Sequence, residues 1–513
     1  MQRSFTLMLP LLLLTACLLC STVASAEETL TTAPAVIITP TVGPPTTKVL
    51  VSGTGFDPNV AVDIYFDKAD LAVATTNGAG AFGGGSVFGG IALQVPASAL
   101  PGTHWITARE RSGKAAQKSF LVRTDWTQFR FDLARDGFNP YENILSPATV
   151  GGMNLHWSYQ TTWDVESSPS VVNGVVYVVS GDANMYALSA STGALLWSYT
   201  TGSNDYSSPA VANGVLYFGT GGGILYALNA STGALIWNTI NTGYGIDSSP
   251  AVTNGVVYYG SNDGNFYALN AKTGTLLWKY QTGSYIFASP AVADGVIYFG
   301  TDRYPRGSNF YALNATTGVL LWKYTGGYFL YSSPAVANGV VYVGAEDHNL
   351  YAFNASNGAV LWTYTMGHIV SSPAVANGVV YVGSFDNNLY ALNATTGALL
   401  WKYTTGDQIY SSLAVANGVV YVGSCDGNLY VLNANTGAFL WNYTTGSRIV
   451  MSSPTVANGM VYVGSDGGTI YAFGLPSGQL SEKFSPPERP NPNLLAPNWE
   501  LKPSTPVTRL PGD

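Results

Sequence analysis

The feature that most constrains this chain is a long internal repeat. The phrase Ser-Ser-Pro-Ala-Val-Ala-Asn-Gly, or a near copy of it, recurs through most of the sequence, and a tryptophan closes most of the units. Self-similarity at a period of roughly 40 residues is typical of folds in which each unit buries its surface against its neighbours. The copies of the phrase begin at Ser167, Ser207, Ser248, Ala288, Ser332, Ser371, Ser411 and Ser452, and the closing tryptophans are Trp197, Trp237, Trp278, Trp322, Trp362, Trp401 and Trp441.

The sequence pattern within one repeat unit predicts the same structure for every unit. Four runs rich in β-branched and aromatic residues are separated by turns of Asn, Asp, Gly and Thr, which is typical of an antiparallel β-meander. In the sixth unit these runs are 371–376, 379–382, 389–392 and 398–403. Such a sheet leaves edges and faces uncovered, so the units are expected to stack as propeller blades. Eight copies predict an all-β chain with an eight-bladed β-propeller of four-stranded antiparallel blades, spanning 154–478.

The eighth unit also predicts how the ring closes. It has three β-rich runs, and no tryptophan run follows them. The missing pattern stands before the first unit, in the segment 154–160 around Trp157. We therefore expect this segment to complete the last blade and to join the two ends of the propeller.

The repeat resembles that of pyrroloquinoline quinone (PQQ) propellers. The stretch Ala391–Trp401 follows the family pattern Ala-x-Asp-x-x-Thr-Gly-Lys-x-x-Trp, although Asn mostly replaces the Asp and Ala mostly replaces the Lys. The runs Asp125–Arg130 and Arg135–Pro140 resemble the segment that precedes the propeller in these proteins. The resemblance implies a PQQ- or BamB-like propeller. It does not imply one activity, because the family includes quinoprotein dehydrogenases, BamB-like assembly lipoproteins and sensors without a cofactor.

The start of the chain predicts export. Residues 1–26 combine a basic Arg3, an apolar run and the motif Ala24-Ser25-Ala26, as in a cleaved signal peptide. The apolar run is too short for a membrane span, so no transmembrane segment is expected. We expect a periplasmic or extracellular protein. The Leu-Thr-Ala-Cys run ending at Cys17 leaves a lipid anchor as the less favoured alternative.

Further segments flank the propeller. Residues 34–123 contain short predicted strands and a Ser-Gly-Thr-Gly-Phe phrase, which resembles immunoglobulin-like (IPT/TIG-type) β-sandwich modules. Residues 124–153 form a lead-in segment, and 479–513 form a Pro-rich tail expected to be extended. Only Cys425 survives removal of the leader, so no intramolecular disulfide is expected.

The charge balance excludes one class of partner. Only 10% of the residues are charged, and the 21 Lys and Arg against 29 Asp and Glu give a net charge of −8. This composition lacks the basic surface of a nucleic-acid binder. The four histidines show no metal-ligand spacing, and no catalytic or metal-binding residue is assigned.

The repeat itself points to a candidate ligand site. Positions that are the same in every unit are explained by the shared fold, whereas the residue just before each Ser-Ser-Pro phrase varies. These variable positions, which include Val370 and Met451, are expected at one mouth of the central channel, although ordinary loop variation remains the alternative interpretation. The candidate site residues are Trp163, Glu166, Asp205, Tyr206, Asp247, Phe287, Tyr331, His368, Asp407, Tyr410 and Arg448.

Three functions remain open. The first is a monomeric, exported, non-catalytic binding or scaffold module without a cofactor, whose partner is a protein, a glycan or an envelope component. The second is a PQQ- and calcium-dependent dehydrogenase. The phrase Glu166–Pro169 resembles the Glu-x-Thr-Pro segment near the quinone, but the adjacent cysteine pair of those enzymes is missing. The third is a BamB-like assembly factor. The Cys17 motif favours it, and the immunoglobulin-like module (34–123) and the Pro-rich tail (479–513) oppose it.

Overall fold

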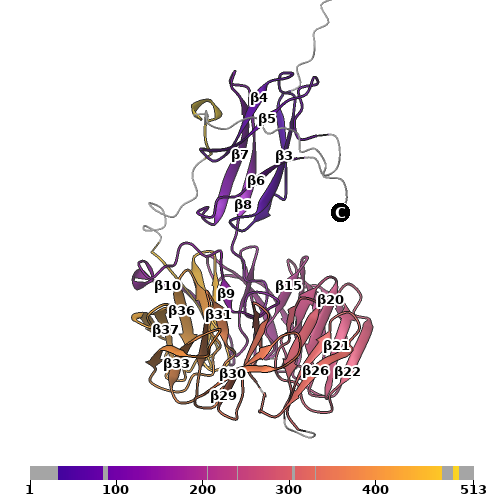
Figure 1. The fold of residues 1–513 in the computed structure, drawn as a ribbon, viewed down its shortest axis with the longest axis vertical. Helices are drawn as coiled ribbons and strands as arrows, with labels where there is room; N and C mark the ends of the chain where they lie inside the picture. Colours follow the sequence, from indigo (N-terminus) through magenta and orange to yellow (C-terminus); the bar gives the residue numbers. More distant parts are fainter. Residues whose placement is uncertain are drawn as a thin grey trace, which may run out of the picture.

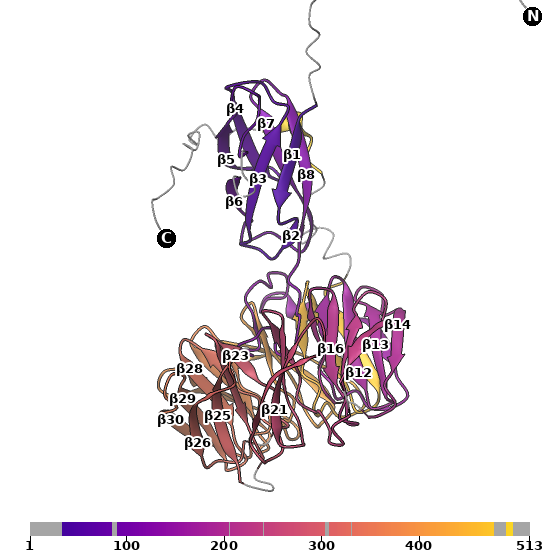
Figure 2. The same ribbon diagram turned by 90° about the vertical axis from the view of Figure 1, so that its right-hand side faces the viewer.

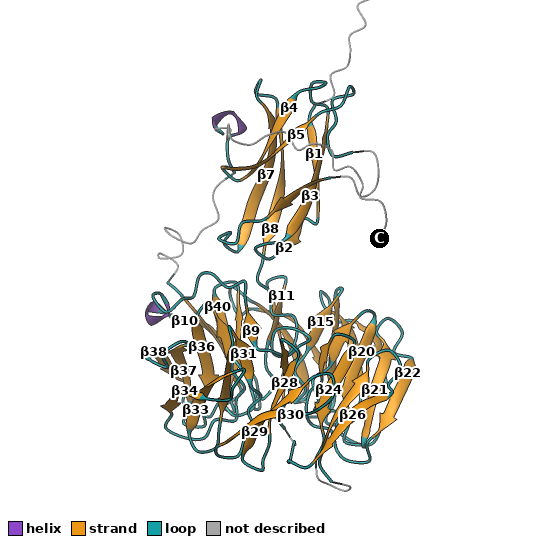
Figure 3. Ribbon diagram, in the orientation of Figure 1, coloured by secondary structure: helices purple, strands orange, loops and turns teal. Residues whose placement is uncertain are grey.

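The fold consists almost entirely of β-strands (Figure 3). The computed structural model describes residues 33–84, 90–204, 206–239, 241–302, 307–329, 331–476 and 489–495. The helices in this part of the chain are two short 3-10 turns, η1 (Val150–Gly152) and η2 (Pro492–Leu494). The prediction of an all-β chain is confirmed. The predicted signal segment and Cys17 lie outside the described residues.

The N-terminal module is a pair of sheets that share one core (Figure 1). Apolar residues alternate with exposed ones along its strands, as in β1, so each sheet has one buried face. Buried Val51, Ile64 and Phe120 come from both sheets. One sheet has the order β1-β3-β6 (Ala35–Thr39, Lys48–Thr54, Ile91–Gln94), and the other has the order β2-β8-β7-β4-β5 (Val42–Gly43, Ala115–Val122, Gly102–Glu110, Ala61–Phe66, Ala69–Thr75).

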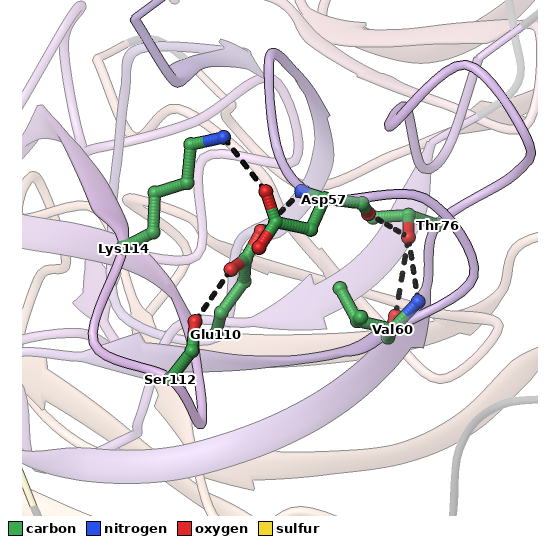
Figure 4. Close-up of polar contacts among 6 residues, drawn as sticks. All are labelled: Asp57, Val60, Thr76, Glu110, Ser112 and Lys114. Atoms are coloured by element: carbon green, nitrogen blue, oxygen red, sulfur yellow. Dashed lines mark hydrogen bonds and ion pairs between the residues drawn. The ribbon is translucent and has the colours of Figure 1, made fainter. Parts of the chain in front are cut away.

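Hydrogen bonds around Glu110 and Thr76 tie the loops at the far end of this module together (Figure 4). The Glu110 carboxylate accepts the backbone N–H of Asp57 and the Ser112 hydroxyl, the latter at 2.7 Å. Lys114 pairs with Asp57 at 3.1 Å. Glu110 is almost fully buried. A buried carboxylate is stabilised when donors surround it, so we assign this cluster a structural role.

The repeats form a ring of blades below this module (Figures 1 and 2). Each repeat is one antiparallel sheet in sequence order, and the first strands of successive blades contact one another around the axis. Numbered along the chain, the sheets in the described residues are blade 1, β11–β14 (Ser170–Val172, Val175–Ser180, Asn184–Ser189, Leu195–Thr200); blade 2, β15–β18 (Ala210–Ala212, Val215–Gly219, Leu225–Asn229, Leu235–Asn238); blade 3, β19–β22 (Ala251–Thr253, Val256–Gly260, Asn265–Asn270, Leu276–Gln281); blade 4, β23–β26 (Ala291–Ala293, Val296–Gly300, Asn309–Asn314, Leu320–Thr325); blade 5, β27–β30 (Ala335–Ala337, Val340–Gly344, Asn349–Asn354, Val360–Thr365); blade 6, β31–β34 (Ala374–Ala376, Val379–Gly383, Asn388–Asn393, Leu399–Thr404); blade 7, β35–β38 (Ala414–Ala416, Val419–Gly423, Asn428–Asn433, Phe439–Thr444); and blade 8, β39–β41 (Thr455–Ala457, Met460–Gly464, Thr469–Gly474) with β10 (Asn154–Gln160).

The repeated tryptophans join neighbouring blades. In the contact between blades 6 and 7, the indole Nε1–H of Trp401 donates to the carbonyl oxygen of Ala434 at 3.0 Å. Gly437 lies against the same ring with φ of +70°, and a Cβ there would lie 2.6 Å from Trp401. Only glycine fits a left-handed position so close to an aromatic ring. The Thr-Gly turn and the tryptophan of the repeat are therefore two halves of one inter-blade contact.

The strand before the first repeat completes the last blade. β10 pairs antiparallel with β41, with Trp157 opposite Ala472. Trp157 is buried, and its Nε1–H donates to Ala190 of blade 1 at 2.9 Å. It therefore makes the same inter-blade contact as the other tryptophans, between blades 8 and 1.

The lead-in segment crosses the inner strands of the ring instead of forming a separate unit. Its carbonyl oxygens accept the N–H of the central valine of one inner strand after another, at 2.7–2.9 Å. At its end, β9 (Phe138–Asn139) pairs parallel with β35 of blade 7. The segment thus covers one end of the central channel. The donor–acceptor pairs are Val171–Trp126, Val211–Thr127, Val292–Leu133, Val336–Ala134, Val375–Asp136 and Val415–Gly137.

The described part of the tail, 489–495, lies on the N-terminal module. The Arg489 guanidinium lies over the ring of Trp105, 4.7 Å from its centre, and donates to Gln117 at 2.8 Å. Arg109 donates to the carbonyl oxygen of Leu495 at 2.7 Å. These contacts hold residues 489–495 on β7 and β8.

Candidate functional site

The residue before each Ser-Ser-Pro phrase faces a single cavity on the propeller axis. The cavity has a volume of about 410 Å³, and every blade contributes that one variable residue. Second serines of the phrase form the wall beneath them. We call this the channel cavity. Its lining residues are Glu166, Tyr206, Asp247, Phe287, Tyr331, Val370, Tyr410 and Met451, six of the second serines (Ser208, Ser249, Ser289, Ser333, Ser372 and Ser412), and Phe129.

The Ser-Ser-Pro phrase builds the wall through two kinds of hydrogen bond. The hydroxyl of the first serine accepts a backbone N–H from the second strand of its own blade, as Ser332 does from Gly344 at 2.9 Å. The hydroxyl of the second serine accepts the N–H of the second serine in the preceding blade, as Ser372 does from Ser333 at 2.9 Å. These bonds fix the backbone, so the side chain just before the phrase is held at the mouth of the cavity.

The lead-in segment supplies the floor of the cavity. Arg130 and Arg135 are fully buried there, and their guanidinium groups donate to backbone carbonyl groups of the inner strands. Arg130 donates to Ser372 and Pro373, and Arg135 to Pro290, Pro250 and Ser249. Five N–H donors in a planar fork suit several converging carbonyl groups. The two arginines therefore act as a plug that joins blades 3, 4 and 6.

The positive charge of the plug is kept away from the cavity. Phe129 lines the cavity, and the Arg135 guanidinium lies over its ring, 5.5 Å from the centre. Burial lowers the pKa of Arg130 and of Arg135 to about 9, because the charged form loses its hydration. No Lys, Arg or His belongs to the described lining of the cavity.

One side of the cavity is acidic. Burial, and then the nearby carboxylates of Asp164 and Asp466, raise the pKa of Glu166 to about 7. Burial also raises the pKa of Asp247, against the opposing effect of a hydrogen bond from Asn262 at 2.7 Å. Both side chains are held in a setting that disfavours an unpaired negative charge.

Blades 2, 4, 5 and 7 contribute aromatic side chains to the cavity. The rings of Phe287 and Tyr331 lie 5.4 Å apart, and Tyr410 packs on Phe385 at 4.1 Å. Burial raises the pKa of Tyr206, and the carboxylates of Glu166, Asp164 and Asp247 add to this effect. Sequence comparison between the repeats missed Phe385 and Phe129. Phe129 lies outside the repeat, and Phe385 is the one aromatic residue in its turn position among the blades.

Several predicted site residues lie outside the cavity lining. Trp163 is 62% exposed, and His368 and Arg448 are also exposed. Asp407 is half-buried in the turn before blade 7, where its backbone oxygen accepts the Thr405 hydroxyl at 2.7 Å. Asp205 lies outside the described residues. His368 contacts His348, with 4.2 Å between ring centres, a pairing that their distance in sequence did not predict.

The cavity does not suit PQQ. This cofactor carries three carboxylates, and a buried anion needs cationic or N–H partners. The lining offers Glu166 and Asp247 instead, and the guanidinium donors of the plug are occupied by carbonyl groups. Among the described residues, no group of three or more His, Cys, Asp or Glu side chains is placed to hold a metal ion.

Comparison with known proteins identifies the repeat. A family model described as outer membrane protein assembly factor BamB, a PQQ-repeat model, matches residues 152–243, 239–328, 326–410 and 386–481, which is more than half of the chain. The chain belongs to the BamB-like PQQ-repeat family. No curated protein matches it.

Solved structures share the fold of this BamB-like chain. A europium-containing methanol dehydrogenase has a TM-score of 0.62 at 15% identity, covering 69% of this chain and 98% of the enzyme. A quinohemoprotein alcohol dehydrogenase from Comamonas testosteroni has a TM-score of 0.61 at 17% identity, covering 69% and 80%. BamB from Moraxella catarrhalis has a TM-score of 0.54 at 19% identity, covering 63% and 99%. At these identities the similarity shows the fold alone.

The prediction of a PQQ- or BamB-like propeller is therefore confirmed. The assignment of the N-terminal module to the immunoglobulin-like group stays a prediction. The described residues contain no helix that is long and apolar enough to cross a membrane.

Proposed function

We propose that this chain is an exported, non-catalytic PQQ-repeat propeller that acts as a binding module, with the channel cavity as its ligand site. The proposal rests on the difference between the repeated serines of the cavity wall and the variable residues that stand just before them. The serines of the wall repeat in nearly every blade, whereas the residue beside them, such as Glu166, Phe287 or Val370, differs from blade to blade. A ligand site requires different chemical groups at chosen positions, and a purely structural channel does not.

The chemistry of the lining favours binding over quinone-dependent oxidation. The cavity presents carboxylates where a quinone tricarboxylate would need cations. The turns that surround the cavity are short, so they add little beyond the ring itself from which to build a catalytic site. The leader pattern at 1–26 supports export, to the periplasm or beyond the cell.

The experiment that tests this function is reconstitution. The mature chain is incubated with PQQ and Ca²⁺, then assayed for quinone absorbance after gel filtration and for alcohol-dependent dye reduction. We expect neither signal. Stoichiometric retention of the quinone together with turnover would overturn the proposal.

A positive test uses a variant with a filled cavity. Val370→Phe enlarges a side chain of the lining and keeps every serine hydroxyl of the wall, and a survey of small molecules by thermal shift compares this variant with the natural chain. Ligands that stabilise the natural chain but not the variant support the cavity as the site. Stabilisation that is equal in both contradicts it.

A second candidate, an outer-membrane assembly factor, is favoured by the description of the family model. An assembly factor of this kind is expected to carry a lipid on Cys17, whereas the first candidate is expected to be cleaved after Ala26. Mass spectrometry of the N-terminus of the exported chain distinguishes them, because a diacylglycerol-modified Cys17 favours the assembly factor.

A further inference from the structure

The channel cavity alternates acidic and aromatic side chains over blades 1 to 4, and blade 5 adds a further aromatic side chain. In ring order these blades contribute Glu166, Tyr206, Asp247, Phe287 and Tyr331. The alternation places an aromatic ring next to each carboxylate. On the opposite side of the cavity, blades 6 to 8 contribute Val370, Tyr410 and Met451, none of which is charged.

One ligand can meet these groups together because they line a single cavity. Its volume is about 410 Å³, and all five side chains belong to its lining. Phe287 and Tyr331 are in ring contact at 5.4 Å. A ligand in this part of the cavity therefore meets aromatic faces and negative charge together.

We propose that the channel cavity binds an organic ammonium ion, with its charge between Glu166 and Asp247 and its alkyl groups against Tyr206, Phe287 and Tyr331. This rests on the proposed function, because it assigns a ligand class to the same cavity. Aromatic faces attract cations within about 6 Å of the ring centre, and more strongly when water is excluded. A cation also neutralises carboxylates that burial leaves without a positive partner.

The arrangement disfavours the other simple ligands. A hard metal ion needs several oxygen ligands converging on one point, whereas Tyr206 stands between the two carboxylates in ring order. An anion would meet those carboxylates, and the Phe129 ring lies between the cavity and Arg135. An alkylated ammonium ion can contact both the carboxylates and the aromatic rings of the cavity.

The test compares choline with its uncharged isostere 3,3-dimethylbutan-1-ol by isothermal titration calorimetry of the mature chain at pH 8. We expect choline to bind at least roughly tenfold more tightly, as cation–π and charge pairing in a desolvated site predict. A peptide that carries trimethyllysine is titrated beside them. Tighter binding of the peptide assigns the ammonium to a protein side chain, and tighter binding of choline assigns it to a free ion.

Two variants and a control locate the effect. Asp247→Asn and Phe287→Leu are each expected to weaken choline roughly tenfold and to leave the isostere unchanged. Asp294→Asn is the control, because it removes a carboxylate from an exposed hairpin turn and restores the Asn that other blades have there. Glu166→Gln serves as the second charge variant if Asp247→Asn does not fold.

Two results would overturn the ligand class. Equal binding of choline and its isostere would show that charge is not selected, and the channel cavity would remain a ligand site. Absence of binding by choline and by the peptide would also reject an ammonium ligand. The quinone reconstitution above decides the proposed function separately from both results.

Discussion

The hydroxyl of Ser168 accepts the backbone N–H of Ser453 at 2.9 Å, which joins blade 1 to blade 8 across 285 residues of sequence. The bond belongs to the same series that links the second serines of neighbouring blades around the channel. Ser453 is the member of the series whose own hydroxyl has no hydrogen-bond partner among the described residues. The series therefore continues from the last blade to the first and lacks its member between blades 7 and 8, where the Ser411 hydroxyl donates to the carbonyl oxygen of Ser452 at 2.9 Å.

Closure of the ring predicts a large effect for Trp157→Ala. The substitution removes a buried aromatic side chain and its hydrogen bond to Ala190, so we expect a loss of about 3–5 kcal/mol in the free energy of unfolding. Urea denaturation of the purified chain measures it. Leu155→Ala, on the same strand but 37% exposed, is the matched control. An unchanged transition for Trp157→Ala would contradict closure by β10.

Glu166 predicts a pH dependence of stability. Its pKa is about 7 in the folded chain and near 4.5 when unfolded, so the folded state binds the proton more tightly. The associated stability is present below about pH 4.5 and is lost as the pH rises through 7. We expect Glu166→Gln to raise the melting temperature at pH 8 and to leave it nearly unchanged at pH 4. Asp294→Asn is expected to show no such difference, and a variant that melts like the natural chain at both values would refute the assignment.

The arginine plug predicts that Arg135→Met destabilises the propeller. The change leaves the carbonyl groups of Pro250 and Pro290 without their donor in a buried site, at a cost of roughly 3 kcal/mol. Chemical denaturation followed by circular dichroism is the measurement. Arg448→Met, at an exposed position, should cost less than about 0.5 kcal/mol. Equal losses of stability in the two variants would show that the buried contacts of Arg135 do not stabilise the propeller.

The docked tail predicts a link between Trp105 and residues 489–495. Trp105→Ala removes the ring beneath Arg489, and we expect faster deuterium uptake in the tail segment, because its contact surface is lost. Hydrogen–deuterium exchange with peptide mass spectrometry reads this directly. Lys118→Ala, on the neighbouring strand β8, is the control. Unchanged uptake in both variants would mean that the hydrogen bonds from Arg109 and Gln117 hold the segment without the Trp105 ring.

Sequence comparison predicted the parts of the fold that repeat. The Ser-Ser-Pro phrase, the Thr-Gly turn and the tryptophan occur in nearly every unit because each makes the same contact with the next blade. It also placed the variable residues, such as Glu166 and Asp247, at one mouth of the channel, and these residues line the channel cavity because they directly precede a rigid phrase. The periodic contacts could be predicted because they are local in the repeat.

The contacts that occur once could not be predicted in this way. Arg135 bonds to Pro290, 155 residues further along the chain, and Arg489 reaches back to Trp105. No spacing in the sequence marks such pairs. Trp163 and Arg448 were predicted beside the site, but they are exposed outside the cavity lining, because a side chain four residues before the phrase is not fixed by the serine bonds.

The most direct test of the ammonium site is a crystal structure with (2-bromoethyl)trimethylammonium, whose bromine gives an anomalous signal. The account predicts an anomalous peak inside the channel cavity, with the trimethylammonium group against Phe287 and Tyr331 and near Asp247. A peak confined to the outside of the ring, or no peak at a concentration that saturates binding in solution, would contradict it.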